Sequence, residues 1–188
     1  MILDDEDFMR LALAEAEKAY ELGEVPIGAV LVAEDGTVIC AGHNMRETNR
    51  DATGHAEIEV IRAANKRLNR WRLSGATLYV TIEPCPMCAG AIVNSRIQRV
   101  VYGGLDMKAG AVHSIFNVLT NPRLNHQVQV TAGVLEDECV GIMKRFFKLR
   151  RQQIKNITSF KMPPSSLGGG KQTTTAGEHI SQLVATRS

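Results

Sequence analysis

Four residues in two short segments have the types and spacing of a metal-dependent hydrolytic site. The segments are His55-Ala56-Glu57 and, further along the chain, Glu83-Pro84-Cys85-Pro86-Met87-Cys88. One imidazole and two thiols would fill three positions of a tetrahedral zinc ion and leave the fourth open to water, which is the arrangement of catalytic zinc. We therefore predict that His55, Cys85 and Cys88 bind one Zn²⁺, and that Glu57 is the general acid and base beside the bound water.

The local spacing supports these roles. Cys85 and Cys88 are three residues apart at the start of a predicted helix, so both thiols face the same side. A helix N-terminus lowers the pKa of a thiol, and we expect both cysteines to bind as thiolates. Glu57 follows His55 by two residues, so its carboxylate cannot easily share the ligand direction of His55, but it can flank the water.

Two other interpretations of the Cys-x-x-Cys pair fit the sequence less well. A redox dithiol has no use for a His-x-Glu partner, so that alternative is disfavoured. A structural zinc site would need a fourth protein ligand. Cys40 lies in a predicted strand and Cys139 in a predicted amphipathic helix, where buried free cysteines are common. The candidates for a fourth ligand are Cys40, Cys139, His113 and His126.

The pattern of apolar residues and turn residues predicts the elements that would carry this site. Two adjacent strands joined by an Asp-Gly turn, followed by alternating strands and helices, indicate an α/β fold with a mixed sheet and helices on both faces. Residues 44–54 are predicted to form a loop. Helices are expected over residues 4–22, 55–68, 84–94 and 136–155, with a short one over 112–119, and strands over 26–32, 37–42, 77–82, 99–102 and 128–131.

Composition places the chain among globular proteins. Its 188 residues suffice for one domain, which we place at residues 1–160, and residues 161–188 have the Pro, Gly, Ser and Thr content of a flexible tail. No apolar run approaches the roughly 18–20 residues of a membrane span, and the acidic N-terminus is unlike a signal peptide. We therefore expect a cytoplasmic protein whose four cysteines are thiols.

Charge is distributed unevenly along the chain. Residues 1–143 carry a net charge of −6, whereas residues 144–188 carry +8. The predicted C-terminal helix interleaves basic residues with aromatic ones, which favours contact with a polyanion such as RNA. The alternative is a solvated helix end, because cations also favour helix C-termini. The basic residues are Lys144, Arg145, Lys148, Arg150, Arg151 and Lys155, and the apolar ones are Phe146, Phe147 and Leu149.

The two-part motif resembles the His-x-Glu and Pro-Cys-x-x-Cys signature of zinc-dependent nucleobase deaminases. The resemblance extends from about Phe8 to Arg151 and is strongest to the bacterial tRNA-specific adenosine deaminases. It is carried by Glu24-Val25-Pro26-Ile27-Gly28-Ala29-Val30, Gly42-His43-Asn44, Thr77 to Cys85, Asn94-Ser95-Arg96-Ile97, Leu124-Asn125-His126 and Phe146-Phe147.

The resemblance implies a cytidine-deaminase-like three-layer α/β/α sandwich with a five-stranded mixed sheet. It implies that a zinc-activated water attacks C6 of the wobble adenosine (position 34) of a tRNA anticodon, releasing ammonia and leaving inosine. Asn44 matches a residue that contacts the flipped base, and Asp106 and Lys108 match an RNA-backbone contact. The family works as a homodimer, and residues 94–102 with the preceding helix would form the interface.

The motif defines deamination but not the substrate, because deaminases of free bases share it. Three hypotheses follow. The first is hydrolytic deamination of adenosine 34 in the anticodon stem-loop of tRNA, with Arg150 and Arg151 among the RNA contacts. The second is deamination of free guanine or cytosine, which would not need a basic helix. The third is a zinc-stabilised RNA-binding module without catalysis.

Overall fold

The computed structural model describes residues 3–159. The chain divides into two units, Met1–Gln152 and Gln153–Ser188, and the described part of the second unit, residues 153–159, is helical. The predicted tail, residues 161–188, lies outside the described residues, and the domain boundary at residue 160 stays a prediction. Within the described part, no helix combines the length and apolar character needed to cross a bilayer.

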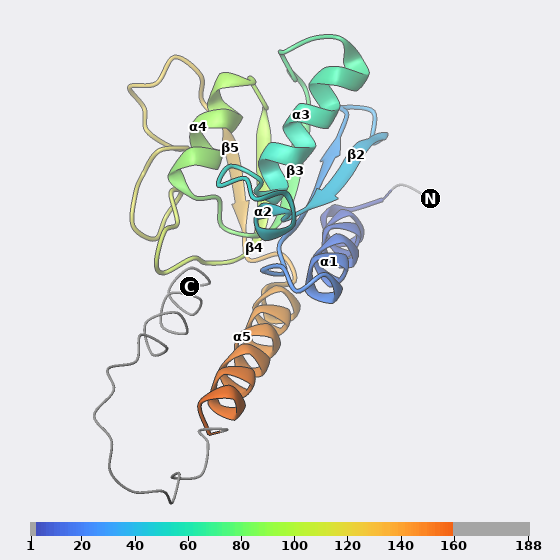
Figure 1. Cartoon of the computed structure of the whole chain (residues 1–188). Helices are drawn as coiled ribbons and strands as arrows, with labels where there is room; N and C mark the ends of the chain where they lie inside the picture. Colours follow the sequence, from blue (N-terminus) through green and yellow to red (C-terminus); the bar gives the residue numbers. More distant parts are fainter. Residues whose placement is uncertain (1–2, 160–188) are drawn as a thin grey trace, which may run out of the picture. The chain divides into compact units, whose positions relative to one another are not determined.

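The first unit is built on a five-stranded sheet with the strand order β2-β1-β3-β4-β5 (Figure 1). β1 is antiparallel to both of its neighbours, whereas β3, β4 and β5 are parallel. The strands are β1 (Gly28–Val32), β2 (Val38–His43), β3 (Thr77–Ile82), β4 (Arg99–Gly104) and β5 (Gln129–Ala132). The helices are α1 (Asp5–Glu21), α2 (Arg46–Asn49), α3 (Ala56–Leu68), α4 (Pro86–Asn94) and α5 (Glu136–Ser159).

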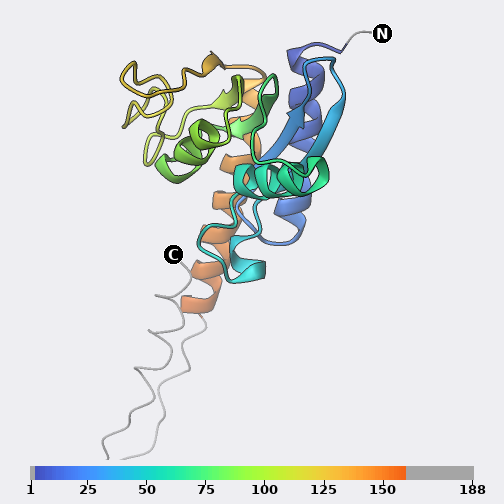
Figure 2. The same ribbon diagram turned by 90° about the horizontal axis from the view of Figure 1, so that it is seen from above.

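Alternation along the strands divides the core into two clusters, one on each face of the sheet. Leu31, Leu78 and Val100 pack with α3 and α4, while Val30 and Val101 pack with α1 and α5. Seen from above, α3 and α4 lie on one side of the strands and α1 on the other (Figure 2). This arrangement confirms the expected three-layer α/β/α sandwich, because successive strand side chains point to opposite faces.

Helix α1 begins with an acidic capping box and packs very closely on β1. The Asp4 carboxylate accepts from the Asp7 backbone N–H, and the Asp7 carboxylate accepts from that of Asp4. A Cβ atom at Gly28 would lie 2.0 Å from the Ala12 carbonyl oxygen. Only glycine therefore allows the backbones of α1 and β1 to approach this closely.

The element boundaries differ from the expected ones at two places that matter for the site. A four-residue helix, α2, lies inside the predicted loop 44–54. The expected helix over residues 112–119 is wrong: the segment forms turns in which the backbone N–H groups of Val112, His113 and Ser114 point at the Glu83 carboxylate. The apolar content of the segment suggested a helix, but these donors are taken by a side chain instead of by helical carbonyls.

Candidate active site

Two of the predicted metal ligands occupy the position immediately before a helix. His55 is the N-cap of α3 and Cys85 the N-cap of α4, and both have extended backbone conformations. Pro86, the next residue, suits the first helical position because its missing N–H would have had no intrahelical partner. The loop before each helix ends there, so each side chain projects from the start of a rigid element.

His55, Cys85 and Cys88 converge on one point. Their ligand atoms all lie within 4.8 Å of one another, and the Nδ1 atom of His55 is 3.6 Å from each Sγ atom. Two ligands of a tetrahedral zinc ion, at Zn–N of about 2.0 Å and Zn–S of about 2.3 Å, are separated by about 3.6 Å. The donor set and its spacing therefore fit a zinc ion. No other three His, Cys, Asp or Glu side chains meet in this way within residues 3–159.

The pKa values of Cys85 and Cys88 are shifted in opposite directions. A hydrogen bond from Cys88, together with one from His55, lowers the pKa of Cys85 to about 4. The same hydrogen bond to Cys85, together with burial, raises the pKa of Cys88. The negative charges of Glu57 and Cys85 add to this shift because they repel a second thiolate, and the expectation that both cysteines bind the metal as thiolates stays a prediction. A divalent cation would remove this repulsion, so the pair is suited to binding one.

Glu57 lies directly beside the cluster and is almost completely buried, with 4% of its surface exposed. Burial is the main reason that its pKa is raised to about 7, and the negative charge on Cys85 adds to the shift. A carboxyl group with a pKa near neutrality both accepts and donates a proton readily. This position and environment suit the proton transfer that the sequence predicts for Glu57.

The candidates for a fourth protein ligand lie elsewhere. The Cys40 thiol donates to the Val60 carbonyl, and the His113 ring nitrogen Nδ1 lies 2.6 Å from the Tyr102 hydroxyl. Nε2 of His126 lies 2.6 Å from the Ile97 carbonyl oxygen. Cys139 is buried against the far face of the sheet in the cluster formed with α1. Each is engaged in local packing or hydrogen bonding, which leaves a three-ligand site.

Asn44 is buried next to this site, and its orientation is fixed. Its backbone follows β2, and the neighbouring Met45 N–H donates to the Gly54 carbonyl, directly before His55. The Asn44 Nδ2 atom donates to Glu24, which is 1% exposed and also accepts from the Thr48 N–H. The other end of the amide, the Asn44 Oδ1 atom, accepts no hydrogen bond from the described residues. Within residues 3–159 every buried side-chain oxygen does have a partner, so this oxygen must be accessible to solvent.

The loop that carries Asp106 and Lys108 is tied to the segment before Cys85. Glu83, which follows β3, accepts hydrogen bonds from four backbone N–H groups of this loop, among them that of Asp106. Burial opposes ionisation of Glu83, but the hydrogen bonds from Ser114 and from the backbone lower its pKa to about 2. The Asp106 carboxylate itself accepts from the Lys108 and Ala109 N–H groups, so it shapes the loop.

Sequence reasoning missed the roles of Glu24 and Glu83. The available signal was their position: each acidic side chain lies beside an otherwise apolar strand, and buried carboxylates require hydrogen-bond donors. Glu24 precedes β1, and Glu83 follows β3. Which donors they meet depends on loops whose conformation the sequence pattern did not indicate.

The basic helix α5 is anchored through its aromatic side. Phe146 is buried, and its ring meets Tyr20 of α1 edge-on at 5.9 Å. Arg145 binds Glu17 at 2.6 Å and lies over the Tyr20 ring, so its charge is already paired. The Arg150 guanidinium lies 5.7 Å from the Phe146 ring, and Arg151 is exposed. Within the described residues, neither Arg150 nor Arg151 contacts the metal cluster.

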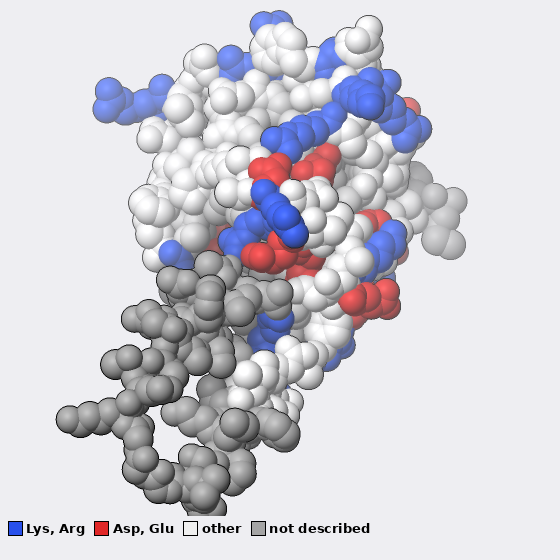
Figure 3. All heavy atoms as spheres, in the orientation of Figure 1, with Lys and Arg blue, Asp and Glu red and all other residues white. Residues whose placement is uncertain are grey.

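Charges of both signs occur on the face that carries α3. Figure 3 shows Lys and Arg atoms beside Asp and Glu atoms across the middle of this face. Arg62 of α3 illustrates the pairing, since it lies 3.3 Å from Asp51 and 3.5 Å from Glu59. Neutralisation of this kind gives no single-sign field around α3, in contrast to the basic run in α5.

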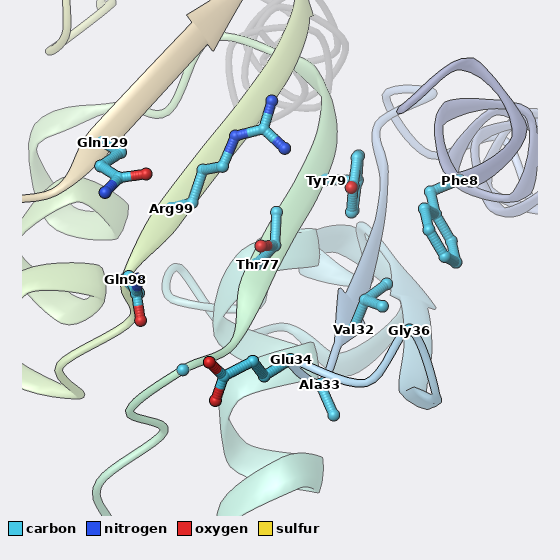
Figure 4. Close-up of a pocket in the computed structure, with 11 residues that line it drawn as sticks. Phe8, Val32, Ala33, Glu34, Gly36, Thr77, Tyr79, Gln98, Arg99 and Gln129 are labelled. Atoms are coloured by element: carbon cyan, nitrogen blue, oxygen red, sulfur yellow. The ribbon is translucent and has the colours of Figure 1, made fainter. Parts of the chain in front are cut away.

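One cavity of about 240 Å³ lies away from the metal cluster. Thr77, Arg99 and Gln129, the first residues of β3, β4 and β5, contribute to its wall, whereas Cys85 lies beyond the last residue of β3. Figure 4 shows Arg99 and Tyr79 projecting from neighbouring strands there. Both side chains bind Asp5, so their polar groups are already satisfied. The cavity contains none of the predicted site residues.

Comparison with known proteins gives consistent results. The family of MafB19-like deaminases matches residues 3–151. A tRNA-specific adenosine deaminase of Bacillus subtilis (strain 168) is 53% identical over 151 residues, which is 80% of this chain and 93% of that protein.

Two solved structures carry further information. A chain from biochemical and structural studies of A-to-I editing by tRNA:A34 deaminases at the wobble position of transfer RNA is 50% identical, with a TM-score of 0.69 over 72% of this chain and 97% of that one. The guanine deaminase of Bacillus subtilis is 27% identical, with a TM-score of 0.53 over 98% of this chain and 94% of that one. The RNA-editing neighbour is thus much more similar in sequence.

Proposed function

The chain belongs to the family of tRNA-specific adenosine deaminases, and from this premise we propose that it converts adenosine 34 of a tRNA anticodon to inosine by hydrolysis. The observation that carries the chemistry is the buried Glu57 carboxyl beside three converging ligands, His55, Cys85 and Cys88. When bound there, a Zn²⁺ ion would supply a water molecule acidified to near neutrality. The net reaction consumes one water and releases one ammonia.

The protein's own groups then have defined tasks. Glu57 accepts the protons of the water and delivers one to the ring nitrogen N1 and one to the amino nitrogen that leaves C6 as ammonia, and its pKa of about 7 suits these transfers. Asn44 is held by Glu24 so that its amide oxygen faces away from that carboxylate. A base entering the site must therefore offer a hydrogen-bond donor to Asn44, as the amino group of adenine does.

Recognition of RNA would come from two elements outside the reacting centre. Lys108 is exposed on the loop that begins at the same sheet edge as Cys85, and Arg150 and Arg151 lie on α5. Cationic side chains bind phosphates, and a single-stranded anticodon loop can release a base at low cost. A homodimer and a cytoplasmic location are further parts of this proposal and rest on the resemblance.

The alternative substrate, a free base such as guanine, is kept because of the similarity to a guanine deaminase over nearly the whole chain. One assay separates the two. The purified protein is incubated with tRNA carrying adenosine 34 and, separately, with guanine, cytosine and adenosine, and inosine and ammonia are measured. Inosine in the tRNA alone supports the proposal, whereas ammonia from a free base alone contradicts it.

Glu57→Gln provides the matched control for catalysis. Because the amide cannot carry the proton, we expect a loss of about 10²–10⁴-fold in kcat, with the zinc content unchanged. Zinc is measured by plasma emission spectrometry on the same sample. A variant that retains wild-type kcat would show that another group moves the proton.

A further inference from the structure

The segment from Leu105 to Phe116, here called the Glu83 loop, is organised around one carboxylate. Glu83 is 3% exposed. Its Oε1 atom accepts from the N–H groups of Val112, His113 and Ser114 at 3.0, 2.7 and 3.0 Å. Its Oε2 atom accepts from the Asp106 N–H at 3.1 Å and from the Ser114 hydroxyl. Three consecutive N–H groups on one oxygen form the kind of anion-binding nest that a backbone builds around a charge.

The fit around this carboxylate is tight and extends to the metal-binding segment. A Cβ atom at Gly110 would lie 2.4 Å from the carboxyl carbon of Glu83, so no larger residue fits there unless the loop or the carboxylate shifts. The Ala111 N–H donates to the Pro84 carbonyl at 2.8 Å, next to Cys85. The loop is thus attached at both Glu83 and Pro84, immediately before the first thiol.

Several side chains of the Glu83 loop are exposed to solvent, whereas its backbone is bound by the Glu83 carboxylate. Met107 is 69% exposed and Phe116 is 50% exposed, and Lys108 is also on the surface. The loop leaves β4 at Gly104, which pairs with Ile82 at the carboxyl end of β3, the edge from which Cys85 follows. Aromatic, apolar and cationic side chains next to a reactive centre are suited to stacking on bases and binding phosphates.

We propose that Glu83 is a positioning residue for the RNA substrate: it holds the Glu83 loop in the conformation that presents Lys108 and its neighbours beside the metal site. This inference rests on the proposed function. A purely structural role for the carboxylate predicts a different outcome, because it would affect metal binding, kcat and stability together. A positioning role affects RNA binding and leaves the chemistry at Glu57 intact.

Glu83→Gln is the sharpest variant, since an amide oxygen can still accept from Val112, His113 and Ser114, but an amide NH₂ cannot accept from the Asp106 N–H. We expect faster hydrogen exchange at the Asp106 amide and retained protection at residues 112–114. With an anticodon stem-loop as substrate, we expect KM to rise about tenfold or more, as for the removal of a hydrogen bond to a charged group, with kcat and zinc content within about twofold of wild type.

Two further variants complete the test. Ser114→Ala removes one hydroxyl donor and leaves the Asp106 contact, so its KM should stay close to that of wild type. Gly110→Ala keeps the glutamate but places a Cβ atom 2.4 Å from its carboxyl carbon and 2.7 Å from the Asp106 carbonyl oxygen, so the contact between Glu83 and the loop must change. We expect it to raise KM as Glu83→Gln does, and it replaces Glu83→Gln in the test if that variant does not fold.

The outcomes separate this inference from the proposed function. A wild-type protein that deaminates no RNA would overturn the proposed function, and this inference with it. If wild type is active on the stem-loop, an unchanged KM in Glu83→Gln despite faster exchange at Asp106 would overturn this inference alone. Loss of zinc and of kcat in that variant would likewise overturn it and assign Glu83 to the metal site.

Discussion

The Asn44 side-chain amide donates to the Glu24 carboxylate over 3.1 Å, and both side chains are at least 95% buried. Because a carboxylate only accepts, this contact turns the NH₂ end of the Asn44 amide toward Glu24 and leaves the amide oxygen for the base that we propose enters the site. In Glu24→Gln, the new amide oxygen still accepts from the Thr48 N–H, so the glutamine NH₂ group faces Asn44. Two NH₂ groups cannot hydrogen-bond to each other, and the Asn44 amide must therefore rotate by about half a turn so that its oxygen faces the glutamine. We expect kcat/KM for the stem-loop to fall about 10–100-fold, measured by inosine formation.

The exchanged pair E24Q/N44D tests the same idea in reverse. An aspartate at position 44 accepts from the glutamine amide and presents its second oxygen to the site, so part of the activity that Glu24→Gln removes should return. Full activity in the single variant would contradict the assigned orientation of Asn44.

Removal of one thiol should abolish metal binding. We expect Cys85→Ser to bind less than about a tenth of the wild-type zinc, because the two remaining ligands and a serine hydroxyl cannot replace the thiolate pair. Added zinc should raise the Tm of wild type, as expected when a ligand binds only the folded state, but not that of Cys85→Ser. Cys40→Ser is the matched control, since its hydroxyl can still donate to the Val60 carbonyl. Equal zinc contents in both variants would exclude Cys85 as a ligand.

Asp5 should make stability depend on pH in the acid range. It accepts hydrogen bonds from Arg99 at 2.8 and 2.6 Å and from the Tyr79 hydroxyl at 2.9 Å. These contacts, that of Arg99 foremost, lower the pKa of Asp5 below its ordinary value of 3.8. The stabilisation is therefore fully present above pH 3.8 and disappears as the pH falls through the lower folded-state pKa.

The measurement is urea unfolding of wild type and Asp5→Asn at about pH 7 and about pH 3, on either side of the ordinary carboxyl pKa. We expect a difference in the free energy of unfolding of about 1 kcal/mol at neutral pH, a modest value for a partly exposed group, and a smaller one in acid. Glu6→Gln, which breaks an exposed pair with Arg10, should show almost no difference under either condition. If the difference in the free energy of unfolding between wild type and Asp5→Asn were larger in acid than at neutral pH, the pKa of Asp5 could not be lowered in the folded state.

Salt dependence distinguishes RNA-binding arginines from structural ones. Replacing Arg150 and Arg151 by Gln should weaken tRNA binding and reduce the slope of log K against log salt by about 0.7–0.9 for each phosphate that is no longer neutralised. Arg145→Gln should leave that slope unchanged, because Arg145 is engaged with Glu17 and Tyr20. Filter binding at several salt concentrations gives both slopes. If the double variant has the wild-type slope, Arg150 and Arg151 do not bind RNA phosphates, and the basic residues of α5 are a solvated helix end.

Much of the fold could be predicted because the strands have clear patterns. The strand predicted over residues 77–82 has the same bounds as β3, and the antiparallel pair β1 and β2 follows from the Asp35-Gly36 turn. The pattern predicted five strands, the same number as the resemblance implied, and each of them has a counterpart in the sheet. The turns at residues 112–119 could not be predicted, because their conformation is set by Glu83, a partner 29 residues or more away.

In the candidate site, too, the features set by local sequence were predictable and those set by distant residues were not. The cluster of His55, Cys85 and Cys88 was predictable because each residue lies at the start of a helix and the combination of the two motifs is typical of metal binding. The raised pKa of Cys88 was not, because besides the hydrogen bond to Cys85 it depends on burial and on the nearby charge of Glu57, which the spacing of the two cysteines does not indicate. The orientation of Asn44 depends on Glu24, which no local pattern connects to it.

The short distance along the chain between Glu83 and Cys85 has a thermodynamic consequence. One residue, Pro84, separates the carboxylate that holds the loop from the first thiol, and its carbonyl is itself bound by Ala111. Any effect that metal binding has on RNA binding through this segment would be reciprocal. If filling the metal site tightens RNA binding by some factor, RNA must tighten metal binding by the same factor. A chelator would then remove the metal less readily from the protein with bound RNA than from the free protein.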